Sequence, residues 1–218
     1  MKSLILIVAL CIILSGCAAQ MELKREDNLR SSVIALEDAQ LCCKSFEEMN
    51  FIPLQKSGKN KYRIDRTSPA FDFDSGKSFF SAFEVPQYEK PYVLNVESWV
   101  DGGSLLPEMH LLYPSLLFLN ESFKPIALIK ELPYVFDVWW TTSGMEANLV
   151  MGEESRTAKY LVVFMEQSKQ GNIFTAHEGG GIMPLVTGSG TMYMPTGGAT
   201  HRFPFNAEGI INIEVHRK

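Results

Sequence analysis

Cysteine is scarce in this chain of 218 residues, which has only four. A domain that depends on a disulfide scaffold has far more cysteine for its length, so the sequence excludes that class. The chain also lacks an excess of basic residues, because its formal net charge is −5. Proteins that bind nucleic acid present a basic face, so we expect no nucleic-acid partner.

The N-terminus lacks an apolar run long enough to span a membrane, which takes about 20 residues. Its run from Leu4 to Leu14 has 11 residues and follows a basic start at Lys2. This build is typical of a secretory signal peptide. The next residues, Leu14-Ser15-Gly16-Cys17, resemble a bacterial lipobox, whose cysteine is acylated, with palmitate among its chains, and becomes the first mature residue. An ordinary cleavable signal with an incidental cysteine is the alternative.

Lipidation at Cys17 implies a permanent anchor, because two or more acyl chains hold a protein stably on a membrane. Ala18 stands where aspartate would signal inner-membrane retention in enteric bacteria, so we expect the periplasmic face of the outer membrane. The expected organisation is a signal peptide over 1–16, a polar tether over 17–30 and one domain over 31–218. Without residues 1–16, the remaining 202 residues carry 19 basic and 25 acidic side chains, a net charge of −6.

Catalytic signatures are missing as well. The sequence has no Gly-x-Ser-x-Gly nucleophile elbow, and its glycine cluster lacks the Lys-Ser/Thr ending of a phosphate-binding loop. No histidine or second cysteine pair lies at metal-ligand spacing from Cys42 and Cys43. We therefore expect a protein that is not an enzyme and that needs no metal and no cofactor.

Two adjacent cysteines, Cys42 and Cys43, remain once Cys11 leaves with the signal and Cys17 carries lipid. Neighbouring Cα atoms lie about 3.8 Å apart across a trans peptide, whereas ordinary disulfides span roughly 4.4–6.8 Å. A bridge between these two residues would therefore be a strained vicinal ring. The alternatives are two buried thiols at the end of a helix and a bridge to another chain.

Hydrophobic periodicity predicts one helix followed by strands. Apolar residues recur at helical spacing over about 29–43. Short apolar or alternating segments between turn residues predict strands over 71–73, 79–85, 92–97, 116–119, 125–132, 160–164 and 209–215, with a hairpin turn at 120–122. Strands and helices do not alternate. The pattern therefore predicts a mainly β fold, an antiparallel β-sandwich or jelly-roll-like domain with a short N-terminal helix.

Glycine is concentrated in one segment, since residues 179–209 hold 8 of the 16 glycines together with three prolines. This composition predicts a long loop, which is uncommon inside a compact domain and is often functional or mobile. A surface excursion between two strands is the simpler interpretation.

The aromatic stretch from Tyr134 to Trp140 is the most suggestive of ligand binding. Aromatic faces stack on sugar rings, and Asp137 can accept hydrogen bonds from hydroxyl groups. Successive residues of a strand point to opposite faces, so only one of Trp139 and Trp140 can face a given ligand. The candidate ligand-binding residues are therefore Tyr134, Asp137, Trp139 and Trp140, with core packing as the alternative.

Several strand-and-turn segments belong together as a pattern: Cys42-Cys43, 45–54, 68–73, 76–86, 112–120, Lys124-Pro125, 160–164 and 208–215. Over roughly residues 42–216, this pattern resembles the maltose operon periplasmic protein family (MalM). The resemblance implies export to the periplasm and an association with carbohydrate transport. It implies no enzymatic activity and no defined binding residues.

The anchor and the resemblance together predict a periplasm-facing envelope lipoprotein that is accessory to carbohydrate transport. Its expected partners are the membrane, held through the lipid on Cys17, and a saccharide or an envelope transport protein. The alternative is a structural or interaction lipoprotein of the outer membrane with no sugar ligand.

Overall fold

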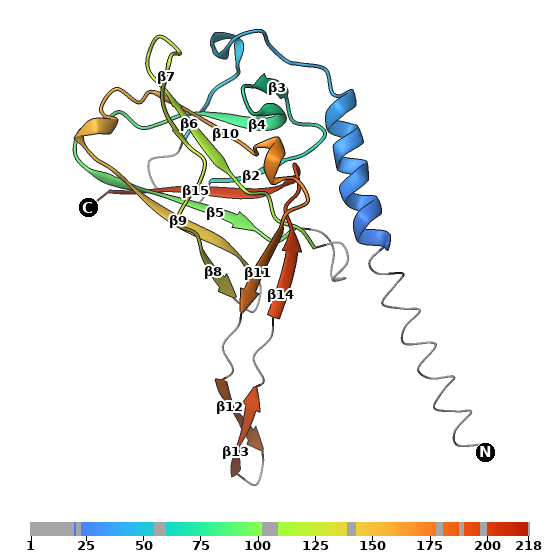
Figure 1. Ribbon diagram of the computed structural model, residues 1–218. Coiled ribbons are helices and arrows are strands. Elements are labelled where there is room, and N and C mark those ends of the chain that lie inside the picture. The colour runs from blue at the N-terminus through green and yellow to red at the C-terminus, as the bar shows by residue number, and fades with distance from the viewer. Residues whose placement is uncertain are drawn as a thin grey trace.

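Most of the described chain is β-strand, arranged in two large sheets that pack face to face and in two additional two-stranded ribbons (Figure 1). The computed structural model describes residues 20, 23–54, 60–101, 109–138, 143–177, 181–187, 190–196 and 200–217. The described residues include three short 3₁₀ helices: η1 (Phe46–Glu48) before the first strand, and η3 (Glu153–Ser155) and η4 (Gln167–Lys169) between strands. In the described part of the chain, no helix is long and apolar enough to cross a membrane.

The first sheet has six strands. Its order is β1 (Ile52–Pro53), β4 (Gly76–Glu84), β10 (Tyr160–Phe164), β6 (Ser115–Leu119) and β7 (Pro125–Ile129), with β3 (Ala70–Phe73) also paired to β4. The pairs are antiparallel except that β1 runs parallel to β4. The strand predicted over 160–164 is therefore central, as its uniformly apolar sequence indicates.

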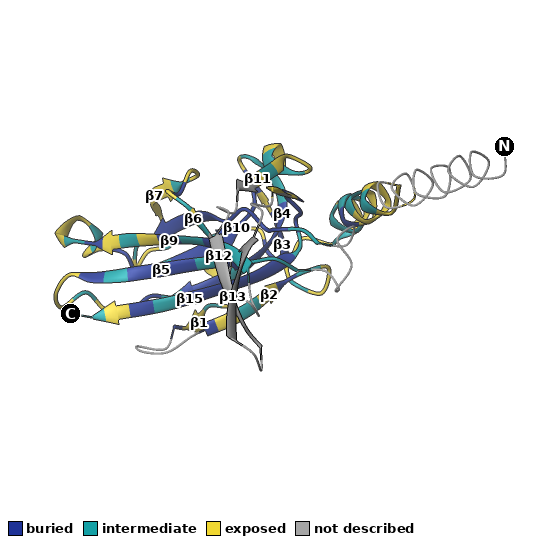
Figure 2. Ribbon diagram, turned by 90° about the horizontal axis from the view of Figure 1, so that it is seen from below, coloured by how far each residue is buried: buried dark blue, intermediate teal, exposed yellow. Residues whose placement is uncertain are grey.

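The second sheet has five strands and is antiparallel throughout. Its order is β2 (Asn60–Ile64), β15 (Gly209–Arg217), β5 (Tyr92–Trp99), β9 (Ser143–Met151) and β8 (Val135–Val138). Figure 2 looks onto this sheet from outside, with β9, β5, β15 and β2 side by side. The two sheets confirm the predicted mainly β, sandwich-like fold with an N-terminal helix.

The core has two parts, one on each side of the six-stranded sheet. Between the sheets, buried side chains such as Phe83, Leu161 and Ile213 form one cluster. On the outer face of the first sheet, Phe80 and Val162 belong to a second cluster, which the segment 41–54 covers. Strands buried on both faces have uniformly apolar sequences, which explains why 116–119 and 160–164 do not alternate.

Residues 23–38 are helical, so the helix predicted over about 29–43 is wrong at both ends. The helix extends into the segment expected to be a tether, 17–30. It ends early because the following chain joins the sheet: Leu41 bridges to Ala70, whose carbonyl accepts a hydrogen bond from the Cys42 amide at 2.9 Å. A buried hydrogen bond of 3.0 Å from Asn206 Nδ2 to Ser32 Oγ fastens the helix to the sandwich.

The glycine-rich segment is a pair of ribbons, so the predicted long loop is wrong. Strand β11 (Ile173–His177) pairs with β14 (Thr200–Pro204), and β12 (Gly181–Thr187) pairs with β13 (Gly190–Thr196), both in antiparallel register. Figure 1 shows β12 and β13 as an arm below β11 and β14, clear of both sheets. The sequence of this segment did not indicate strands, because it is rich in glycine and proline and both residues are depleted in ordinary strands.

Candidate functional site

The predicted aromatic stretch is only partly described. The ring of Tyr134 is partly buried against the core, 5.4 Å from that of Tyr113, and its hydroxyl lies 3.5 Å from the Pro114 carbonyl oxygen. Burial, and then the charge of Tyr113, raises the pKa of the Tyr134 hydroxyl well above its ordinary value. Tyr134 is therefore placed for packing, the alternative that the sequence left open.

The structure gives less information on the other three candidate residues of that stretch, Asp137, Trp139 and Trp140. Asp137 on β8 is the backbone partner of Gly144 on β9, and Gly144 is in turn the partner of Trp99 on β5. Asp137 and Trp99 therefore lie at the same level of the five-stranded sheet, with one residue between them. Trp139 and Trp140 lie outside the described residues. A role of these residues in ligand binding stays a prediction.

The adjacent cysteines lie between the helix and the outer face of the six-stranded sheet. Their Sγ atoms are at bonding distance, and their Cα atoms are 3.8 Å apart. Cys42 is exposed, whereas Cys43 is 7 % exposed and belongs to the second core cluster. Formation of the ring in the exported protein stays a prediction, and so does lipidation of Cys17, which lies outside the described residues.

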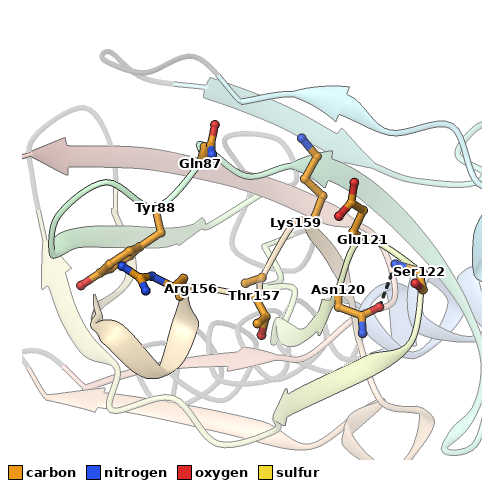
Figure 3. A pocket seen from close by; sticks show the side chains of 9 residues that line it. Gln87, Tyr88, Asn120, Glu121, Ser122, Arg156, Thr157 and Lys159 are labelled. Atoms are coloured by element: carbon orange, nitrogen blue, oxygen red, sulfur yellow. Dashed lines mark hydrogen bonds between the residues drawn. The ribbon is translucent and has the colours of Figure 1, made fainter.

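A polar cleft of about 640 Å³ lies at one end of the six-stranded sheet (Figure 3). Its lining comes from three loops and consists of Gln87, Tyr88, Asn120, Glu121, Ser122, Arg156, Thr157, Ala158 and Lys159. Figure 3 shows Tyr88 beside Arg156 on one side of the cleft and Lys159, Glu121 and Asn120 toward the other.

Strand order brings these three loops together. Tyr160 begins β10 and pairs with Glu84 at the end of β4 and with Leu119 at the end of β6. The Val85 amide donates to the Lys159 carbonyl at 3.0 Å, and the Lys159 amide donates to the Leu119 carbonyl at 2.9 Å. The loops after β4, after β6 and before β10 therefore form one hydrogen-bonded rim.

The turn from β6 to β7 forms a rigid wall of the cleft. The Oδ1 atom of Asn120 accepts hydrogen bonds from the amides of Ser122 at 2.9 Å and Lys124 at 3.0 Å. Between those residues, Phe123 has φ 57°, in the left-handed region that bulky residues rarely adopt. Its ring stacks on Tyr160, which offsets this strain with aromatic contact.

The opposite wall carries charge. Arg156 Nη1 lies 3.1 Å from Glu153 Oε1, and both side chains are about two-thirds exposed, so the pair contributes little to stability. Desolvation, followed by the negative charge of Glu153, raises the pKa of the Tyr88 hydroxyl. Tyr88 therefore stays protonated at neutral pH, with a hydroxyl that can donate a hydrogen bond.

The lining suits reversible binding of a hydroxyl-rich molecule. Arg156 and Lys159 supply donors, Glu121 supplies acceptors, and the amides and hydroxyls supply both. Tyr88 adds an aromatic ring to the lining and is itself partly buried against the core. Glycoside hydrolysis generally uses two carboxylates, whereas the described lining contains one, on Glu121.

The outer face of the five-stranded sheet is a second polar surface. Three neighbouring strands each carry an asparagine and a glutamate two positions apart: Asn212 and Glu214 on β15, Asn95 and Glu97 on β5, and Glu146 and Asn148 on β9. Alternation in the sequence places these pairs on the face opposite the core.

Most of the polar groups on this second surface bond to one another, although Asn95 Oδ1 and Asn212 Oδ1 are buried without a hydrogen-bond partner. Glu97 Oε2 accepts hydrogen bonds of 2.9 Å from both Asn212 Nδ2 and Trp99 Nε1. Asn95 Nδ2 donates to Glu146 Oε1 at 2.6 Å. Lys61 Nζ lies 4.5 Å from the centroid of the Trp99 ring, so the aromatic face is already occupied. The network therefore stabilises the sheet, and the open cleft is the stronger candidate site.

A metal centre is not evident in the described ranges, where no group of three or more His, Cys, Asp and Glu side chains is placed to hold an ion. The expectation of no metal and no cofactor stays a prediction. Sequence reasoning found one wall of the cleft, the hairpin turn at 120–122. It missed the loops around Tyr88 and Arg156, because the pairing of β4 with β10 is not visible in the sequence.

Comparison with known protein families gives a match over the segment that contains the cleft. Residues 75–180 match the family described as "Maltose operon periplasmic protein precursor (MalM)", and this segment contains every residue that lines the cleft. Comparison with curated proteins and with solved structures gives no significant match. The family's description names a periplasmic protein of a maltose operon and no enzyme. Residues 75–180 of this chain are therefore a MalM family domain, as the strand-and-turn resemblance predicted for this part of the sequence.

Proposed function

We propose that this protein is a non-enzymatic envelope lipoprotein that binds a saccharide in the cleft and assists carbohydrate uptake. It faces the periplasm and is held at the outer membrane by the lipid on Cys17. The observation that carries the proposal is that all nine lining residues of the cleft lie within the MalM family domain.

The size and chemistry of the cleft support a small saccharide. Ligand pockets are typically about 300–1,000 Å³, and the cleft has about 640 Å³. Its walls are held by backbone hydrogen bonds from Val85 and Lys159 and by the Asn120 side chain. A preformed site of this kind binds with a smaller cost in conformational entropy.

Calorimetric titration with maltose, maltotriose and maltoheptaose tests the ligand. We expect binding heat on titration of the full mature chain. Absence of heat at millimolar sugar would favour the alternative, a structural or interaction lipoprotein of the outer membrane without a sugar ligand.

Metabolic labelling with palmitate tests the anchor. The wild-type protein is expected to incorporate the label, and a Cys17→Ala variant is expected to lose it. A wild-type protein that carries no label at its N-terminus would show that the signal is an ordinary cleavable one. This readout concerns the covalent lipid alone and does not depend on other membrane contacts.

A further inference from the structure

The β12–β13 arm stands apart from the rest of the fold. Its two strands pair with each other, from Gly181 opposite Thr196 to Thr187 opposite Gly190. Neither strand packs extensively against another strand of the described chain. Figure 1 shows the arm extending below β11 and β14, away from both sheets.

The sequence of the arm is apolar and free of charge. Residues 179–200 form an unbroken stretch of 22 residues without Asp, Glu, Lys, Arg or His. Directly opposite positions carry apolar residues on both strands: Ile182 with Pro195, Met183 with Met194, Pro184 with Tyr193, and Leu185 with Met192. Successive pairs alternate between the two faces of the ribbon, so both faces are apolar by sequence.

An apolar hairpin of this kind is expected to be covered by another molecule. An isolated two-stranded hairpin is marginally stable in water at best, because it has no layer against which to bury its side chains. Contiguous apolar surface on a protein marks a contact with another macromolecule or with a membrane. Neither β12 nor β13 packs extensively on another strand of the described fold, so the apolar sequence of the arm indicates a contact with something outside this chain.

We propose that the β12–β13 arm lies in the lipid interface as a second membrane contact of this protein. Charged residues are costly in lipid, and the arm has none over 22 residues. Tyr193, at the centre of β13, is of a residue type enriched at membrane–water interfaces.

Vesicle co-sedimentation tests the arm without the lipid. The probe is a vesicle of phosphatidylethanolamine and phosphatidylglycerol, and the parent is the full mature chain carrying Cys17→Ser. We expect the parent to sediment with the vesicles. A Leu185→Asp/Met192→Asp variant should lose about tenfold in partitioning, because aspartate is strongly disfavoured in lipid.

A matched control places the same number of charges on the body of the protein. Val150 on β9 is 71 % exposed and Val135 on β8 is 69 % exposed, so Val135→Asp/Val150→Asp should leave both partitioning and the melting temperature unchanged. The arm variant should also melt like the parent, because the arm adds little to the packing of the sandwich. Equal partitioning of the parent and the arm variant, or no sedimentation of the parent, would overturn the proposal.

Hydrogen exchange gives a second readout that needs no arm variant. On addition of the same vesicles, the amides of residues 181–196 in the parent should become protected. Protection by whole envelopes but not by vesicles would mean that a protein covers the arm, which also overturns the membrane proposal. Failure of palmitate labelling at Cys17 would remove the anchor but leave both of these results unaffected.

Discussion

Phe123 stacks on Tyr160 with ring centroids 4.7 Å apart and ring planes 11° apart, from a backbone with φ 57°. Tyr160 is the residue that joins β10 to both of its neighbours at the cleft. The stacked pair therefore couples the strained turn on one wall to the strand ends that position the other loops. We therefore predict that the contact between Phe123 and Tyr160 stabilises this turn, since the φ of Phe123 is one that phenylalanine rarely adopts.

Substitution of Phe123 separates these two effects. Phe123→Ala and Phe123→Gly both remove the ring, but only glycine adopts positive φ freely. We expect both variants to be less stable than the parent, and the glycine variant to be more stable than the alanine variant by about 1 kcal/mol. Urea unfolding measures the difference. An alanine variant at least as stable as the glycine variant would contradict the strained turn.

Glu97 should matter more to stability than its neighbour Glu214 on the same face. Removal of the Glu97 carboxylate in Glu97→Ala leaves the amide of Asn212, which is fully buried, without its acceptor. An orphaned buried donor costs about 1–3 kcal/mol. Glu214 makes a longer contact of 3.7 Å with His216, so Glu214→Ala serves as the control and should change the free energy of unfolding little. Equal effects of the two substitutions would rule out the network as a source of stability.

The stability of the fold should decline in alkali. Burial, and then hydrogen bonding to the Glu131 carboxylate, raises the pKa of Tyr113 from 10.0 to about 12. The folded state therefore favours the protonated hydroxyl. Its contribution is fully present below pH 10 and is lost as the pH rises from about 10 to about 12. Thermal melts across this range should show a smaller decline for Tyr113→Phe than for the parent, and identical slopes would refute the role of Tyr113.

The two adjacent cysteines should react differently. If the vicinal ring forms on export, the mature protein resists alkylation until it is reduced. After reduction, the exposed Cys42 should be alkylated before Cys43, which is 7 % exposed. Peptide mass spectrometry over a time course measures both rates. Rapid alkylation without a reductant would show that the ring is absent, and equal rates would contradict the burial of Cys43.

Much of the fold follows from the sequence because burial leaves a clear pattern. The run at 160–164 and the alternation at 209–215 predict β10 and β15, since each sequence matches the faces that its strand buries. The predicted C-terminal boundary of the helix is wrong because Leu41 and Cys42 continue the helical spacing but contact Ala70, which is distant in sequence. The arm was missed because proline and glycine interrupt strands that lack a core to bury.

The candidate site was less predictable than the fold. The turn at Asn120 has a local signal, since its side chain bonds the amides of its own loop. Tyr88 and Arg156 have no such signal, because they meet only when β10 inserts between β4 and β6. The aromatic residue Tyr134 drew notice in the sequence but packs against the core. The order of the strands brings these loop residues together into a site, and that order cannot be read from the sequence.

Titration of two arginine variants with maltotriose tests saccharide binding in the cleft most directly. Arg156 lines the cleft and pairs with Glu153 at 3.1 Å, while Arg66 lies outside the lining and pairs with Glu208 at the same distance. We expect Arg156→Ala to weaken maltotriose binding by about tenfold, the equivalent of one charge-assisted hydrogen bond, and Arg66→Ala to bind like the parent. Equal affinities of the two variants and the parent would contradict binding in the cleft.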